Sequence, residues 1–383
     1  MNQGVVGMIA NPVSARDIRR VVAASGSLTL NDRVSIVLKI LSGLKAGGVH
    51  QVWMMPDKTG LSDMVQREVN RGQAALAKSA RSKQTSSKQA VPKKTGERQG
   101  FPELKLLPIP ITGTEQDTIN AAFACEDRKF SAIVVLGGDG THRLVVKHAR
   151  DTPITGYSTG TNNAFPETVE PSLIGLATAL YASGQIPKET ALSPNKLLQL
   201  RIQEKAHSGT EGKTAPIEDI ALVDAAITSD RFVGSKAVWQ PDTLRAVYVT
   251  FASAMQVGLS SIIGLSAPVE RTDPCGRFVE LSNNADTSSL TNASSLTVPL
   301  IPGVFMPVAI QTLSTLNPNQ PVGLRYGSAA IALDGEREHI VEALDDVTLE
   351  LIPNAFFTIN VEACMNACAA RMLLCNQQGE CDA

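Results

Sequence analysis

The hydrophobic pattern of the first half of the chain alternates short apolar runs with segments of helical spacing. The runs that read as strands are residues 4–12, 49–57, 131–136 and 153–159. The segments with helical spacing are residues 32–48, 117–130, 143–150 and 171–185. Because strands and helices alternate, the pattern predicts a parallel sheet with helices packed on its faces.

Beyond about residue 190 the pattern changes to short β-rich runs that are broken by glycine, proline and asparagine. Examples are KLLQLRIQE (196–204), LRAVYVTFA (244–252) and DVTLELIP (346–353). Such spacing is typical of a β-sandwich or a similar all-β layer. We expect the boundary near residues 186–195, which gives an α/β domain over 1–188 and a β-rich domain over 189–343.

Residues 73–100 depart from both patterns, because they are rich in Lys, Ser and Gln and carry hardly any large apolar residue after Leu76. Between positions 78 and 98 the net charge is +6, which leaves −8 for the rest of the chain. We expect a flexible surface insertion in the first domain. A cationic flap that attracts a phosphorylated ligand is the alternative.

Composition narrows the classes of function. The chain has 383 residues, 43% of them hydrophobic, and a formal net charge of −2, so it is no general polyanion binder. No aromatic residue interleaves with the basic tract, so we expect no nucleic-acid partner. Neither a signal peptide nor an apolar run of membrane-spanning length is present, which predicts a cytoplasmic protein without a membrane partner. The clustered cysteines Cys364, Cys368 and Cys375 favour small buried thiols over zinc ligands.

The segment 133–150 (IVVLGGDGTHRLVVKHAR) places three glycines and an acid between an apolar run and a helix. The first backbone N–H groups of a helix lack intrahelical acceptors, so phosphate oxygens can accept those bonds and the helix dipole favours their charge. Larger side chains would hold a phosphate away, which explains why Gly137, Gly138 and Gly140 are bare. A tight turn that needs positive φ is the alternative.

Asp139 is the unusual member of this segment, because a carboxylate repels phosphate. Its presence is explained if it accepts a proton from a substrate hydroxyl that attacks a phosphoryl group, or if it helps to hold Mg²⁺. An aspartate that only makes local turn hydrogen bonds is equally common. The residues alone leave these interpretations even.

A second polar segment, GYSTGTNNAFP (156–166), also follows an apolar strand and carries hydroxyl and amide side chains. Consecutive βα turns of a parallel sheet open on the same edge, so these side chains should line a crevice shared with residues 137–141.

The sequence does not match two other phosphate-binding motifs. GTEGKT (209–214) has too few residues between its glycines for a Walker A loop, and Arg143 stands where the Rossmann fingerprint needs a third glycine.

These segments together resemble the superfamily of ATP-NAD kinases and diacylglycerol- and sphingosine-type lipid kinases. GGDGT followed about twenty residues later by GTNNAFP, and then by a β-rich half, is typical of that superfamily. NPVSA (11–15) is similar to its N-P-x-S-G segment, and LDGERE (333–338) to its D-G-E/Q element. The most similar branch is the acetoin catabolism protein X group of ATP-NAD kinase-like proteins, through segments such as IANPVSARDIRR (9–20) and VGLSSIIG (257–264).

The resemblance implies an N-terminal Rossmann-like parallel α/β domain, a C-terminal β-sandwich-like domain and a final segment (344–383) that returns to the first domain. ATP and the acceptor would meet between the domains, with Mg²⁺ as cofactor. Asp139 would be the general base or a Mg²⁺ partner, and Glu336 a further metal ligand. The residues implied in nucleotide or phosphate binding are Asn11, Gly137, Gly138, Gly140, Thr141, Ser158, Thr161 and Asn162, and those implied in acceptor binding are Asn163 and Asp224.

The sequence departs from NAD kinases at the pair of residues that holds the acceptor NAD. Those enzymes have Asn-Glu early in the second domain, where this chain has Val223 and Asp224, and Ala15 replaces a glycine of the first motif. We expect an ATP-dependent kinase that acts on NAD or a related small molecule, linked to acetoin catabolism and forming a homo-oligomer. A nucleotide-binding regulator that has lost catalysis and a lipid kinase are the alternatives.

Overall fold

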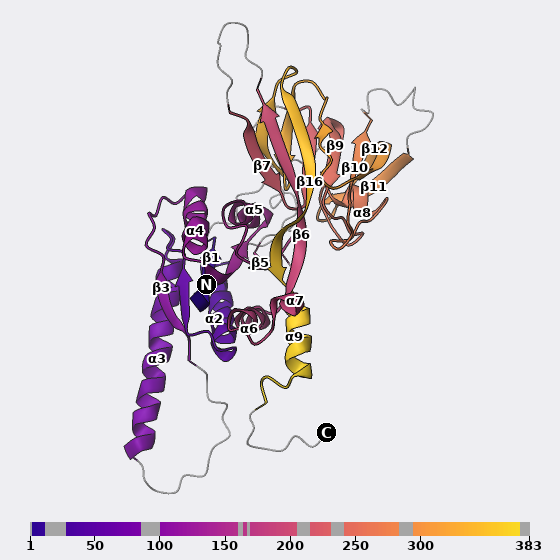
Figure 1. The fold of residues 1–383 in the computed structure, drawn as a ribbon. Coiled ribbons are helices and arrows are strands. Elements are labelled where there is room, and N and C mark those ends of the chain that lie inside the picture. Colours follow the sequence, from indigo (N-terminus) through magenta and orange to yellow (C-terminus); the bar gives the residue numbers. More distant parts are fainter. Residues whose placement is uncertain are drawn as a thin grey trace.

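The N-terminal half contains a parallel sheet of five strands (Figure 1). The structure is a computed structural model that describes residues 2–11, 28–85, 100–159, 164–166, 169–204, 215–230, 241–282 and 294–375. The strands are β1 (Asn2–Ala10), β2 (Gln51–Met54), β3 (Glu103–Leu106), β4 (Phe130–Gly137) and β5 (Ile154–Ser158). Their order is β3-β2-β1-β4-β5, so the direction of winding reverses between β1 and β4. Ligands of doubly wound sheets bind at the carboxyl ends of the strands on either side of such a reversal.

Helices cover both faces of this sheet. They are α2 (Leu30–Ala46), α3 (Leu61–Thr85), α4 (Glu115–Asp127), α5 (Asp139–His148) and α6 (Pro171–Ala182). Helix α3 extends through the first part of the segment predicted as an insertion, and residues 86–99 lie outside the described residues. Helix α2 begins with a capping box, in which Thr29 and Asp32 satisfy each other's backbone N–H groups.

The second half is antiparallel. A seven-stranded sheet has the order β11-β12-β10-β9-β8-β14-β15. Its strands are β8 (Asp224–Thr228), β9 (Leu244–Val249), β10 (Gly276–Leu281), β11 (Ser294–Ile301), β12 (Val304–Leu316), β14 (Ala329–Leu333) and β15 (Glu336–Val341). The helix α8 (Ser261–Gly264) and the 3-10 turn η1 (Pro241–Thr243) complete this layer. The predicted fold class, a parallel α/β sheet followed by antiparallel β structure, is confirmed.

Two long strands join the halves, as Figure 1 shows, by running from the first sheet up to the second. Strands β6 (Leu192–Gln203) and β16 (Asp346–Ile359) pair antiparallel, and the far end of β16 also pairs in parallel with β5 through Thr358 and Ile154. Strands β7 (Ile217–Ala221) and β13 (Val322–Gly323) extend this sheet at the other end. The sheet thus continues from the parallel to the antiparallel half.

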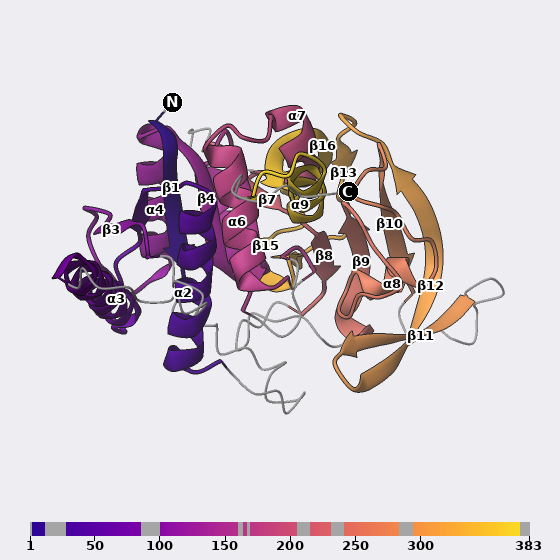
Figure 2. The same ribbon diagram turned by 90° about the horizontal axis from the view of Figure 1, so that it is seen from below.

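The end of the chain packs on the first domain. After β16, helix α9 (Val361–Ala370) lies against α6 and the short helix α7 (Lys188–Ala191), as both ribbon views show (Figure 2). Cys364 and Cys368 are buried in this contact, whereas Cys375 is exposed. Burial raises the pKa of the Cys364 thiol to about 11, so the thiol is protonated at neutral pH.

Helices α2 and α6 approach each other closely because each presents a glycine to the other. A Cβ at Gly175 would lie 2.1 Å from the carbonyl oxygen of Ile40, and a Cβ at Gly43 would lie 2.0 Å from that of Ser172. Neither gap could hold a carbon atom unless one backbone moved. The two glycines therefore set the distance between the helices that cover one face of the sheet.

We predict that Gly175→Ala lowers the free energy of unfolding by about 1–3 kcal/mol, the usual cost of overpacking a core, although alanine is the better helix former. Urea unfolding measures the change. Gly323→Ala is the matched control, because a Cβ there would meet nothing within 4 Å. Equal stability of the two variants would contradict the close approach.

Candidate functional site

The carboxyl ends of β1, β4 and β5 bring together most of the residues predicted to bind phosphate. Asn11 follows β1, and its amide donates to Thr141 Oγ1 at 3.1 Å. Ser158 ends β5, where it pairs with Gly137 at the end of β4. These residues therefore meet at the strand reversal of the sheet. The predicted residues Thr161, Asn162 and Asn163 lie outside the described residues.

The helix after β4 begins earlier than the hydrophobic spacing predicted. Helix α5 starts at Asp139, and Gly138 is its N-cap without a side-chain hydrogen bond to the helix. Spacing alone predicted a start near residue 143, because glycines and an acid carry no helical pattern. The first turn of a ten-residue helix is thus built from the motif itself, and its leading N–H groups lack intrahelical acceptors.

The glycines of the motif do not serve a left-handed turn. Gly138 has φ −90°, and none of the three is among the glycines with positive φ. Gly137 is bare because a Cβ would lie 2.5 Å from the Cβ of Thr141. Outside its own helical turn, a Cβ on Gly140 would come no nearer than 4.0 Å, and the atom at that distance is Glu336 Oε2. The backbone at Gly140 is open, as contact with a phosphate requires.

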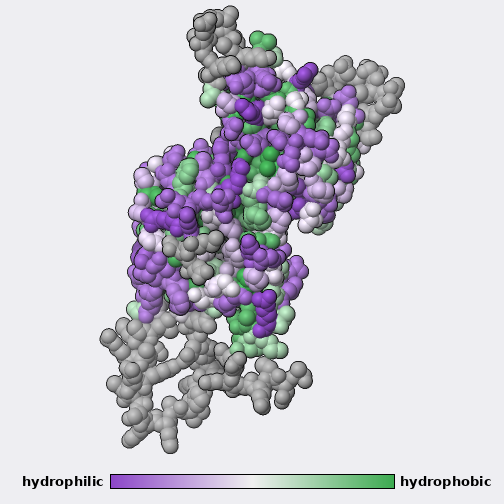
Figure 3. Space-filling view, viewed as in Figure 1, coloured by the Kyte–Doolittle hydropathy of each residue, from purple (hydrophilic) through white to green (hydrophobic). Residues whose placement is uncertain are grey.

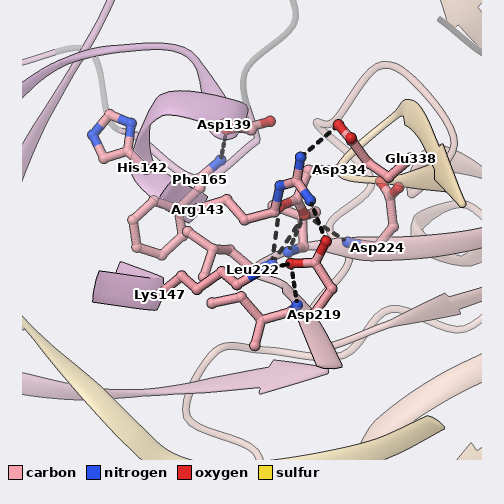
Figure 4. Close-up of polar contacts among 12 residues, drawn as sticks. Asp139, His142, Arg143, Lys147, Phe165, Asp219, Leu222, Asp224, Asp334 and Glu338 are labelled. Carbon is pink, nitrogen blue, oxygen red and sulfur yellow. Dashed lines mark hydrogen bonds and ion pairs between the residues drawn. The ribbon is translucent and has the colours of Figure 1, made fainter. Parts of the chain in front are cut away.

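Asp139 binds the next loop of the sheet. Its carboxylate accepts backbone N–H groups from Ala164 and Phe165, each at 3.0 Å (Figure 4). These residues end the polar segment after β5, so one side chain fixes two βα loops against each other. A carboxylate oxygen can accept more than one hydrogen bond, so this role is compatible with contact to a substrate hydroxyl.

Arg271, which the sequence analysis missed, holds the same loop from the second domain. Its Nη2 donates to the carbonyl oxygens of Ala164 at 3.1 Å and Phe165 at 2.6 Å. Its guanidinium lies over the rings of Phe165 and Phe251, 5.0 and 4.3 Å from their centroids. Arg271 stands between α8 and β10 in no recognisable motif, so no sequence signal identified it.

Arg143, one turn along α5 from Asp139, enters an acidic cluster of the second domain (Figure 4). The side chain of Arg143 is 7% exposed, and its nitrogens lie 2.7 Å from Glu338, 3.6 Å from Asp219 and 3.9 Å from Asp334. Lys147, also on α5, contacts Asp219 at 2.7 Å. The cations of one helix therefore compensate the buried acids of the neighbouring domain.

The acids of this cluster are held by further donors. Asp334 accepts backbone N–H groups of Leu222 and Val223, at 3.0 and 2.8 Å. Burial raises the pKa of Asp334, although Arg143 opposes it. Burial alone would also raise the pKa of Asp219, but hydrogen bonds from His339 and Lys147 outweigh it and hold that pKa well below its usual range. Asp219 is therefore an anion in the folded protein.

His142 is a second residue that sequence reasoning passed over, since the histidines form no ligand cluster. The ring is fully buried, packs on Phe165 and places Nδ1 2.9 Å from the carbonyl oxygen of Gly138. Burial lowers the pKa of His142 to about 4, so the imidazole is neutral, and its Nδ1–H donates a hydrogen bond to the carbonyl oxygen of Gly138. His142 thus stiffens the turn that opens α5.

The predicted acceptor and metal residues differ in their surroundings. Asp224 is 7% exposed and belongs to the turn that Asp334 holds, because its own N–H donates to Asp334 at 3.3 Å. Glu336 reaches from β15 toward Gly140. No group of three or more His, Cys, Asp or Glu among the described residues forms a metal site. Mg²⁺ commonly uses one or two carboxylates together with substrate phosphates, and Asp139 and Glu336 are donors of that kind.

Comparison with known proteins gives two family matches along the chain. Residues 6–186 match the ATP-NAD kinase N-terminal domain, and residues 197–354 match the acetoin catabolism protein X C-terminal domain. The acetoin catabolism protein X of Cupriavidus necator is 44% identical over 361 residues, which cover 94% of this chain and 91% of that protein. Yeast NADH kinase complexed with NADH aligns with a TM-score of 0.47 at 11% identity, over 99% of this chain and 90% of that one.

No described helix is long and apolar enough to span a membrane.

We predict that Arg143→Met lowers the free energy of unfolding by about 3–5 kcal/mol, because it removes the cation beside the fully buried carboxylate of Asp334. Urea unfolding at neutral pH measures the loss. Arg245→Met is the control, since Arg245 donates to backbone carbonyls at the surface, and should cost less than about 1 kcal/mol. Similar losses in both variants would refute the role of the cluster.

We also predict that His142 makes stability depend on pH. Because its folded pKa is about 4 and its ordinary value is 6.5, the unfolded chain binds the proton first. The free energy of unfolding is therefore unaffected by His142 above about pH 6.5. As the pH falls from 6.5 toward 4, protonation of the unfolded chain lowers that free energy by roughly 3 kcal/mol. His142→Gln, which keeps an N–H donor, should flatten that part of the profile. Urea unfolding at several pH values measures the profile. If the free energy of unfolding falls with pH as steeply in the variant as in the unaltered protein, the prediction is wrong.

Proposed function

The chain belongs to the acetoin catabolism protein X family, and from this premise we propose that it is an ATP- and Mg²⁺-dependent kinase. The proposed reaction moves a phosphoryl group from ATP to a hydroxyl of NAD or of a related small molecule. It would act in acetoin catabolism, as the name of its relative suggests. We also propose that the protein works as a homo-oligomer in the cytoplasm.

The observation that carries this proposal is the open backbone at the start of α5, with an acid inside it. Gly138 caps the helix without a side chain, and Gly140 has room on its outer side. Asp139 lies between them, at the strand reversal where doubly wound sheets bind ligands. A loop that only turned the chain would need neither the open backbone nor the acid.

The residues suggest a division of work. The first N–H groups of α5 would hold phosphate oxygens, and Asn11, Thr141 and Ser158 would flank them. Asp139 would accept the proton of the attacking hydroxyl. Mg²⁺, when bound with Asp139 and Glu336 near it, would neutralise charge that develops on the phosphates. Thr161 and Asn162 would contact the nucleotide, and Asn163 with Asp224 the acceptor.

A second function, a nucleotide-binding regulator without catalysis, is favoured by one specific observation. Both oxygens of Asp139 already accept backbone N–H groups, and hydrogen bonds to a carboxylate weaken it as a base. In this alternative the phosphate site remains, and Asp139 serves to connect two loops.

We predict that Asp139→Asn lowers turnover with ATP and Mg²⁺ by about 10²- to 10⁴-fold, the range for a lost general base. Asp117→Asn is the matched control, because Asp117 also accepts two backbone N–H groups, from Thr112 at 2.6 Å and Gly113 at 2.8 Å, but after the edge strand β3. The assay should use purified protein with acceptors that include NAD, NADH, small diols and diacylglycerol.

The outcomes separate the two functions. Product formation that Asp139→Asn abolishes and Asp117→Asn retains supports the kinase. ATP binding with no product from any acceptor supports the regulator. An undiminished rate in Asp139→Asn would remove the role assigned to that carboxylate.

A further inference from the structure

The dipeptide Ala164–Phe165 is bound through all four of its backbone polar groups by two charged side chains. Asp139 of the first domain accepts both N–H groups, each at 3.0 Å. Arg271 of the second domain donates to both carbonyl oxygens, at 3.1 and 2.6 Å. Hydrogen bonds to ionised groups are about twice as strong as neutral ones. A loop held from opposite sides in this way has little freedom to rotate.

The segment that carries Arg271 is itself anchored by a buried cation. Lys196 on β6 donates from Nζ to the carbonyl oxygens of Glu270 at 3.0 Å, Asp273 at 2.7 Å and Cys275 at 2.7 Å. Lys196 is 7% exposed, so these carbonyls replace the water that it would otherwise bind. Arg271 therefore projects from a segment whose backbone is held by β6, one of the two strands that join the halves.

Aromatic packing fixes the other end of the contact. Phe165 is buried, with its ring against His142 of α5 and Phe356 of β16. The guanidinium of Arg271 lies over the same ring and over Phe251. Movement of Arg271 would therefore displace Ala164 and Phe165. Because the N–H groups of these residues bind Asp139, the carboxylate of Asp139 would shift with them.

We propose that Arg271 is a positioning residue for the phosphoryl-transfer site. It fixes Ala164–Phe165, which in turn orient the carboxylate of Asp139 and end the segment predicted to contact nucleotide and acceptor. The first domain would supply the phosphate site, and the second domain would set the geometry of its acid. This inference rests on the proposed function for its effect on turnover, but not for its effect on the loop.

The loop can be tested without any activity, by hydrogen–deuterium exchange of the amides of Ala164 and Phe165. Arg271→Met should speed their exchange roughly 10- to 100-fold, the factor expected for the loss of hydrogen bonds to a charged group. Arg271→Lys, which keeps the charge, should give an intermediate rate. Arg245→Met is the control, because Arg245 also donates to two backbone carbonyls within the second domain.

Two exchange results would overturn the proposal. The first is faster exchange only within residues 265–275, with Ala164 and Phe165 unchanged, which would mean that Arg271 serves its own loop alone. The second is the same protection at both amides in Arg271→Met and in Arg245→Met. If Arg271→Met fails to fold, the lysine variant decides between the outcomes by the same measurement.

Turnover tests the second half of the inference. Arg271→Met should lower kcat about tenfold or more with little change in the KM for ATP, because a small displacement of a reacting group is costly. In an Asp139→Asn background the same substitution should have almost no further effect. Additive losses would overturn positioning through Asp139. Absence of kinase activity in the unaltered protein would refute the proposed function and leave the exchange experiment intact.

Discussion

Helix α5 is the element on which the arrangement of the two domains depends, because its cations compensate acids that the second domain buries. Arg143 and Lys147 extend from the helix and form ion pairs with Asp219, Asp334 and Glu338. Desolvated carboxylates are costly without a partner. The second domain therefore needs α5 in one position, and the same contact positions the glycine-containing turn at the start of that helix.

The site is consequently assembled from both domains, even though its motif lies in the first. Glu336 approaches Gly140 from β15, and Arg271 holds the loop that Asp139 binds. Most of the surface seen in Figure 3 is hydrophilic, and hydrophobic residues show where the two halves meet and again near α9. Packing, ion pairs and site geometry thus act at one interface.

The hydrophobic spacing predicted most strands and helices of the first half in order, because apolar residues that face a buried sheet repeat with clear periods. It missed helix α3 and the short edge strand β3. It also predicted that Thr141 and Ser158 lie at one edge, since βα turns of a parallel sheet open together, and the family resemblance added Asn11. The family resemblance is confirmed by the 44% identical relative. The start of α5 was misplaced because glycines have no periodic pattern.

Arg271, Lys196 and His142 could not be found in this way. Arg271 and Lys196 bind backbone carbonyls that are distant in the sequence, and the role of His142 depends on its burial. Backbone contacts and burial leave no signature in residue type or spacing. The same holds for Asp334, whose side chain binds the backbone of residues 222–224.

The position of β16 has a consequence for biosynthesis. The strand that lies beside β5 belongs to the last part of the chain, although β5 is complete some two hundred residues earlier. While the ribosome makes the second half, β5 is therefore an uncovered sheet edge, which is the kind of surface that recruits other chains. Pairing of β5 with a strand of another chain is prevented only when β16 has emerged from the ribosome and covers that edge.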